Sequence, residues 1–296
     1  MILFFSKKMS TALAAALVMV VVALGPVHAA SPQRAQKTAN PQRIVSLSPA
    51  VTESLYLLGL EKNVVGVTTY CSRPKEAKTR EKVGTIMEPS LERIVKLQPD
   101  LVLAMDLTDR KSVQKMKDLG LNLVTFTIPY TFEGLCDVFV QIGRVTGKFE
   151  ESKRLAGIAK AKVTAIQKAT ARLQRPRVLV QIGSKPFYVA TKDVFMDDYI
   201  DFAGGTNVFR DAVSGSVGRE AAIVRNPDVI FIVTMGLNAQ NERLAWKRFS
   251  TVNAVKNNRI YLIDSDDVCS PTPQSFVRSL GEIAALLHPD EAKGRR

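Results

Sequence analysis

Histidine is nearly missing from this chain of 296 residues. One of its two histidines, His28, falls in an N-terminal segment that we expect to be removed, and His288 stands near the C-terminus. A Ser-His-Asp or Cys-His catalytic system would have to use His288, and the end of a terminal helix is a poor place for one. A metal site built from several histidines is excluded for the same reason.

Other catalytic patterns are equally scarce. Gly204-Gly205 lacks the remaining residues of a phosphate-binding loop and predicts a helix stop. Asp266 and Asp267 form a carboxylate pair suited to acid–base chemistry, but adjacent loop residues usually point apart. We therefore expect no enzymatic activity.

Cysteine is limited to three residues. Cys136 lies in a helix-like apolar pattern, so we expect it to be buried and inert. Cys71 and Cys269 fall in polar loop segments. Three interpretations of this pair stay open: two unrelated structural residues, a disulfide across a cleft, or thiolates that contact a metal-bearing ligand.

No apolar run after the N-terminal segment is long enough to span a membrane. Within that segment, Lys7 and Lys8 precede an apolar run at residues 12–24, and Val27-His28-Ala29 resembles a signal-peptidase site. We interpret residues 1–30 as a secretory signal peptide, cleaved near Ala29 or Ala30. The alternative is a membrane anchor, for which the run is short. No cysteine lies near the cleavage site, so nothing there indicates a lipid anchor. We therefore expect a soluble, exported protein.

Acidic residues are few relative to basic ones: 28 against 41, for a formal net charge of +13. Removal of the two leader lysines lowers this charge to +11. Such a balance favours anionic small molecules, acidic surfaces or anionic lipid, although a basic solubilising surface explains it equally well. Export and the absence of a nucleic-acid motif argue against nucleic acid as a partner.

One unit of sequence occurs twice. Residues 91–103 and 219–231 each carry a Glu seven residues before a Pro-Asp pair, with an apolar run behind it. The first part predicts a short helix, proline ends it, and the apolar run predicts a buried parallel strand. Copies 128 residues apart are too distant for a solenoid and indicate two similar lobes, unless the repeat is coincidental.

Strand–helix alternation in both halves predicts an α/β protein: two αβ lobes with parallel sheets, joined by one long α-helix, with a ligand cleft between the lobes. We place a flexible leader at residues 31–42, the N-terminal lobe at 43–147 and the C-terminal lobe at 175–290, before a charged tail at 291–296. The spanning helix covers residues 148–174, where apolar residues recur at helical spacing without proline. Such a rigid connection predicts only a small lobe movement on ligand binding.

Ligands of parallel sheets bind outside the carboxyl ends of the strands. The loops that we expect there carry aromatic, cationic and carboxylate side chains, a set that suits a large planar or chelated ligand: Tyr70, Cys71, Arg73, Asp106, Phe187, Tyr188, Asp266, Asp267 and Cys269.

Two stretches resemble a known family. Arg43-Ile44-Val45-Ser46-Leu47-Ser48-Pro49 with Thr52-Glu53, and the unit at residues 91–103, are similar to the helical-backbone (class III) periplasmic substrate-binding proteins of ABC importers. The resemblance implies a periplasmic, monomeric protein that delivers cobalamin, a ferric siderophore or haem to a dimeric permease, with no cofactor of its own. It also implies that Glu92 and Glu220 pair with arginines of the permease; the alternative is a Glu favoured by the helix dipole.

The resemblance extends to the ligand loops. Tyr70 matches an aromatic residue that cobalamin-binding members place in the cleft, and Cys71-Ser72-Arg73-Pro74 is similar to their loop. Ile86, followed by Met87, and Ser214 stand where those proteins tend to carry aromatic residues, so the ligand type stays open. Two other classes remain: an enzyme on a related two-lobed fold, such as a chelatase, and an envelope binding protein without a transporter.

Overall fold

The computed structural model describes residues 40–192, 194–234 and 238–290. All of them belong to one compact unit, residues 38–296. The predicted signal peptide, nearly all of the leader, and the charged tail lie outside the described residues. Among the described helices, none combines the length and the apolar character needed to cross a membrane.

The first sheet is entirely parallel. Its strands follow the order β3-β2-β1-β4-β5, and they are β1 (Ile44–Ser46), β2 (Val64–Val67), β3 (Glu81–Lys82), β4 (Leu101–Met105) and β5 (Leu123–Phe126). Every residue of β4 is buried, as expected for a central parallel strand covered on both faces. The connecting segments are α1 (Pro49–Leu57), η1 (Glu61–Asn63), η2 (Lys75–Thr79), α2 (Leu91–Lys96), α3 (Arg110–Asp118) and α4 (Phe132–Val145).

The second sheet has the order β10-β9-β6-β7, with β8 also paired to β6. Its strands are β6 (Arg177–Ser184), β7 (Phe187–Val189), β8 (Thr206–Asn207), β9 (Val229–Val233) and β10 (Ile260–Ile263). The predicted parallel pairing holds for β8, β6, β9 and β10, whereas β7 runs antiparallel to β6. Only Lys185 and Pro186 join the two strands, and so short a connection permits only antiparallel pairing.

The helices of the second half complete the alternation, and the predicted fold class is confirmed. They are α6 (Met196–Phe202), α7 (Arg219–Val224), α8 (Ala239–Trp246), α9 (Asn253–Lys256), α10 (Ser265–Val268) and α11 (Pro273–Leu287).

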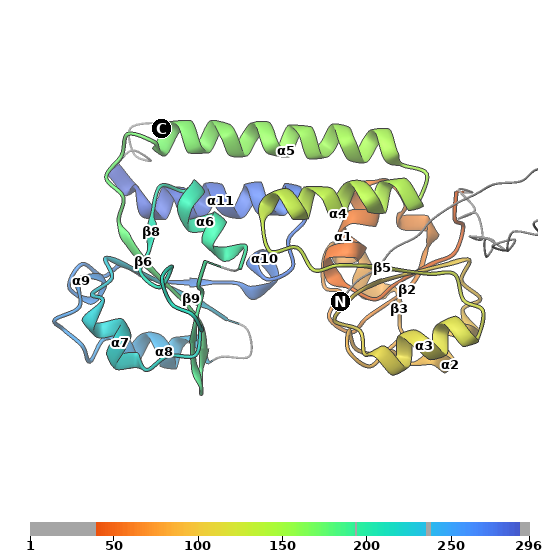
Figure 1. Cartoon of the computed structure of the whole chain (residues 1–296), viewed down its shortest axis with the longest axis horizontal. Helices are drawn as coiled ribbons and strands as arrows, with labels where there is room; N and C mark the ends of the chain where they lie inside the picture. Colours follow the sequence, from red (N-terminus) through yellow and green to blue (C-terminus); the bar gives the residue numbers. More distant parts are fainter. Residues whose placement is uncertain (1–39, 193, 235–237, 291–296) are drawn as a thin grey trace, which may run out of the picture. The chain divides into compact units, whose positions relative to one another are not determined.

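The two sheets are joined by α5 (Phe149–Thr170), a continuous helix of 22 residues that spans roughly 33 Å at 1.5 Å per residue. Figure 1 shows α5 running along α4 and α11, against which it packs. Small buried residues, among them Ser152, Ala156 and Ala159, form its packed face and let the helices approach closely. The connection between the sheets is therefore a packed helical layer.

The repeated sequence unit has one structural role in both halves. Asp100 accepts hydrogen bonds from the backbone N–H groups of Gln42 and Arg43, at 2.7 and 3.1 Å. Asp228 accepts one from Arg177 N–H at 2.9 Å. In each case the Pro-Asp turn holds the start of the neighbouring central strand beside the end of the short helix. The repeat therefore has a structural role, and it places α2 and α7 in equivalent positions in the two halves.

Candidate ligand cleft

A cavity of about 610 Å³ lies where loops that follow the strands of both sheets meet, a size typical of small-molecule sites. Polar, charged and apolar side chains from both halves of the unit line it: Pro49, Tyr70, Ser72, Arg73, Thr85, Ile86, Met87, Glu88, Leu107, Ser265, Asp266, Cys269 and Ser270.

Six of the residues that the sequence singled out line this cavity: Tyr70, Arg73, Ile86, Met87, Asp266 and Cys269. Tyr70 and Met87 have exposed fractions of 58% and 62%. Large, exposed apolar side chains of this kind offer contact area to a ligand at low cost in ordering. The role of these residues in binding remains a prediction.

The prediction that Cys71 faces the ligand is wrong. Its side chain is 1% exposed, and its sulfur lies 3.2 Å from Thr52 Oγ1 and 3.1 Å from Thr68 Oγ1. The residue turns into the core beside Tyr70, so it cannot contact a ligand in the cavity. A disulfide with Cys269 is also contradicted, because Cys71, Cys136 and Cys269 are all free.

Phe187 is a core residue and does not line the cavity. It is 8% exposed, and its ring centroid lies 6.1 Å from that of Trp246 in an edge-on arrangement. Tyr188 points to the other face of the β7 strand and is 44% exposed, but it too lies outside the cavity lining.

Asp106 and Asp267 serve the scaffold around the cavity. Asp106 accepts a hydrogen bond of 3.1 Å from the Ile128 N–H group and so joins the ends of two strands. Asp267 forms ion pairs of 3.2 Å with both Arg73 and Arg278. These contacts occupy both carboxylates with other parts of the protein.

A polar network crosses between the two halves beside the cavity. Ser72 Oγ donates to Asp266 Oδ2 at 2.5 Å, and Arg73 donates to Ser270 O at 3.2 Å. Arg73 also pairs with Glu53 at 3.2 Å, yet Glu53 Oε2 is buried without a well-aligned hydrogen bond. Burial therefore raises the pKa of Glu53 despite the opposing charges of Arg73 and Arg278.

Cys269 is the cysteine that faces the cavity. Burial, with a contribution from the nearby carboxylates of Asp266 and Asp264, raises the pKa of its thiol to about 11. The group is a neutral thiol at neutral pH, which makes a thiolate contact to a metal unfavourable in the unliganded protein. Cys136 is buried, as predicted, and desolvation raises its pKa to about 12.

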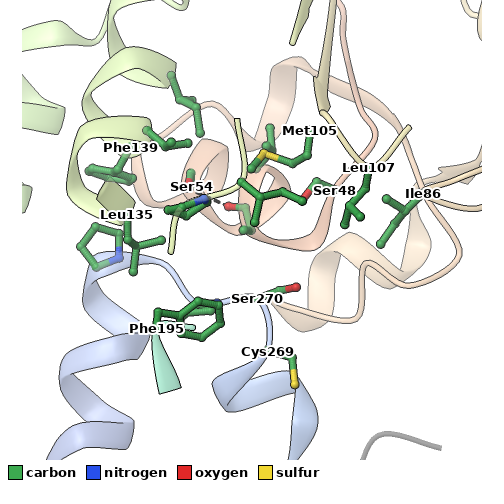
Figure 2. Close-up of a pocket in the computed structure, with 18 residues that line it drawn as sticks. Ser48, Ser54, Ile86, Met105, Leu107, Leu135, Phe139, Phe195, Cys269 and Ser270 are labelled. Atoms are coloured by element: carbon green, nitrogen blue, oxygen red, sulfur yellow. Dashed lines mark hydrogen bonds between the residues drawn. The ribbon is translucent and has the colours of Figure 1, made fainter. Parts of the chain in front are cut away.

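A second cavity, of about 90 Å³, adjoins the first. Figure 2 shows its wall running from Ile86 and Leu107 to Leu135 and Phe139, with Phe195 and Cys269 on another side. Ile86, Leu107, Cys269 and Ser270 line both cavities. The larger cavity therefore has an apolar extension toward α4.

Several lining residues were not singled out as ligand-facing: Pro49, Ser72, Thr85, Glu88, Leu107, Ser265 and Ser270. The rule that ligands meet strand ends could have found Pro49 and Leu107, which closely follow β1 and β4. The same rule covers Ser265 and Ser270, which follow β10 in the segment that also carries Asp266 and Cys269.

Glu92 and Glu220 occupy the same position in the two repeat units, the second residue of α2 and of α7. Both side chains are exposed, and among the described residues neither has an ion-pair partner. Figure 1 shows both short helices on the side of the sheets away from α5. A pair of free anions in equivalent places suits a partner that is itself two-fold symmetric, although the helix dipole also favours a Glu there.

Comparison with known proteins gives consistent matches. Residues 44–267 match the family described as periplasmic binding protein. The uncharacterized ABC transporter substrate-binding lipoprotein YvrC of Bacillus subtilis is 33% identical over 263 residues, covering 86% of this chain and 82% of that protein. The vitamin B12-binding protein of Vibrio parahaemolyticus is 27% identical over 238 residues, covering 79% and 86% of the two chains.

A solved structure is similarly close. It is that of a possible iron-binding (periplasmic solute-binding) protein from Staphylococcus epidermidis, 31% identical, with a TM-score of 0.75; the match covers 84% of this chain and all (100%) of that one.

Proposed function

Because the chain belongs to the periplasmic binding protein family, we propose that it captures a metal chelate in the cavity at the strand ends and delivers it to an ABC permease. The candidate ligands are a corrinoid, a ferric siderophore and haem. The observation that carries the proposal is the cavity of about 610 Å³ lined from both sheets by Tyr70, Met87, Arg73 and Asp266. The proposed site of action is the periplasm, after cleavage near Ala29 or Ala30.

The donor set supports a ligand that brings its own metal-binding groups. Among the described residues, no cluster of three or more His, Cys, Asp or Glu side chains is arranged to hold a metal ion. The thiol of Cys269 is protonated at neutral pH because its pKa is raised to about 11. A metal already enclosed in a chelate needs shape and polarity from the protein rather than direct ligands.

Binding rather than catalysis is the activity that we propose. His288, the one candidate catalytic histidine, has Nε2 at 2.9 Å from Ala203 O and takes no part in lining the cavity. The family's named relatives are binding proteins as well. These observations favour a binding protein over a two-lobed enzyme such as a chelatase.

The ligand can be identified by two measurements. An absorption spectrum of the protein purified from its own periplasm should show a visible band from a bound corrinoid, ferric chelate or haem. Calorimetry on refolded, ligand-free protein with cyanocobalamin, haemin and ferric enterobactin should then give binding with one of them. A colourless protein that binds none of the three would contradict the metal-chelate class.

The role of the two exposed glutamates is tested by charge removal. We expect the double variant Glu92→Gln/Glu220→Gln to bind its ligand with unchanged affinity and to lose transport, because the permease would lack one anion contact per lobe. Glu150→Gln, which removes an exposed charge from the first turn of α5, is the matched control and should transport normally. Loss of ligand binding in the double variant would contradict the assignment.

A further inference from the structure

The small cavity beside the ligand cleft differs from it in chemistry. The cleft carries charged side chains, including Arg73, Glu88 and Asp266. The lining of the small cavity contains no Asp, Glu, Lys, Arg or His, and most of it is aliphatic or aromatic, including Ala50, Leu135, Val138 and Phe139.

Three serines and Cys269 carry the only hydroxyl or thiol groups in this lining. Ser54 Oγ donates to Ala50 O at 2.7 Å within α1. The thiol of Cys269 keeps its proton because its pKa is raised to about 11. Water needs two or more polar partners to be stable in a cavity. An apolar guest is therefore favoured over water at this site.

The size of the cavity limits the guest. Its volume of about 90 Å³ is smaller than the roughly 150 Å³ of an apolar cavity known to take benzene. A short alkyl group fits, and a large planar ring system does not. The ring or metal-binding body of a chelate would have to remain in the larger cleft.

From this geometry we propose that the small cavity is a subsite that receives a short alkyl substituent of the chelate bound in the cleft. Ile86 and Cys269 stand where the two cavities join, since both line each of them. This inference rests on the proposed function, and it narrows the ligand to chelates that carry an alkyl substituent.

Binding of an apolar guest in the subsite can be tested in the absence of the chelate. Xenon under pressure should shift the methyl NMR signals of Leu135 and Val138 in the wild-type protein. Ala50→Leu, which adds three carbons to the cavity from α1, should abolish that shift, and Val138→Leu, which adds one carbon from α4, should reduce the shift at Leu135. Ala161→Leu adds the same three carbons as Ala50→Leu, but on the exposed face of α5, and should leave the xenon-induced shift unchanged.

Selectivity for an alkyl arm is tested with two ferric tris-hydroxamates that share one metal-binding group. Ferric hexanohydroxamate should bind the wild-type protein about tenfold more tightly than ferric acetohydroxamate, because methylene groups of one arm become buried. Ala50→Leu should reduce the ratio to near one, Val138→Leu should lower it by a smaller amount, and Ala161→Leu should preserve it.

The outcomes separate the two proposals. Equal affinity for both chelates, or a ratio that survives both filling variants, overturns the subsite and leaves the cleft assignment intact. Xenon shifts that persist in both filling variants overturn it as well. A xenon shift that is lost in Ala50→Leu supports an apolar receiving site even if neither hydroxamate binds; in that case ferric hydroxamates are not ligands of the cleft, and the calorimetry with the other chelates decides the proposed function.

Discussion

At the scale of single residues, Glu53 is a charged group held at an electrostatic cost beside the cleft. The carboxylate is buried at the junction of the two halves, and one of its oxygens lacks an aligned hydrogen bond. Its two cationic neighbours, Arg73 and Arg278, do not offset the desolvation, so its pKa stays raised. Thr272 and Ser275 are the polar side chains that also face it.

The protonation of Glu53 should therefore make stability depend on pH. The folded protein holds this proton more tightly than the unfolded chain, so the stabilisation is fully present below the ordinary value of 4.5 and is lost as the pH rises through the folded-state pKa. Urea unfolding between pH 4 and 8 should show the free energy of unfolding of the wild type falling relative to Glu53→Gln as the pH rises. A constant difference would contradict this assignment; Glu150→Gln serves as the exposed control.

At the scale of elements, one arginine ties the C-terminal repeat unit to its sheet. Arg219 of α7 pairs with Glu242 of α8 at 2.6 Å and lies over the rings of Phe187 and Trp246, at 4.9 and 5.0 Å from their centroids. Gln181 of β6 donates to the same Glu242 carboxylate at 2.7 Å. Burial alone would raise the pKa of Glu242, but these hydrogen bonds outweigh it and lower the pKa. The cluster fixes the helix that carries Glu220.

Removal of this arginine should cost about 2 kcal/mol of folding free energy, because it leaves a mostly buried carboxylate and two ring faces without a partner. Arg219→Ala should show the loss in urea unfolding followed by the fluorescence of Trp246, the single tryptophan of the chain. Arg154→Ala breaks an ion pair of similar length, 2.7 Å, on the exposed face of α5 and should cost much less, because solvent screens exposed ion pairs. Equal losses in the two variants would contradict a special role for Arg219.

The sequence predicted long elements well because hydrophobic period and proline stops act locally. The spanning helix was expected at residues 148–174 and occupies Phe149–Thr170. The last helix begins at Pro273. Thr272 and Ser275 form a capping box there, and proline stands in its preferred first-turn position. This local pattern of a capping box and a first-turn proline is enough to predict where the helix starts.

Short elements and side-chain directions could not be predicted in the same way. Elements such as β8 and α10, of two and four residues, are too short for any periodicity and are held by tertiary contacts. Tyr70 and Cys71 are neighbours in one loop, but Tyr70 faces the cavity and Cys71 turns into the core. Which of two adjacent loop residues faces a ligand depends on packing partners such as Thr52, distant in sequence.

At the scale of the whole binding unit, the packed helix α5 governs how the two sheets respond to a ligand. We expect solution scattering of the mature protein to show no measurable contraction when the identified ligand is added, because an intact helix resists bending. Ala161→Pro interrupts the helix at an exposed position and should broaden the distribution of distances in both states. A marked contraction of the wild-type protein on loading would contradict the rigid connection.

An uninterrupted helix between the sheets also determines the order of events during capture. If no closure has to follow the encounter, association is a single diffusional step, and its observed rate grows in proportion to ligand concentration without a plateau. How long the ligand stays bound then depends on its rate of dissociation from a preformed binding site. A transporter would recognise the loaded state chiefly by the presence of cargo at the mouth of the cleft, and only secondarily by any rearrangement of the protein.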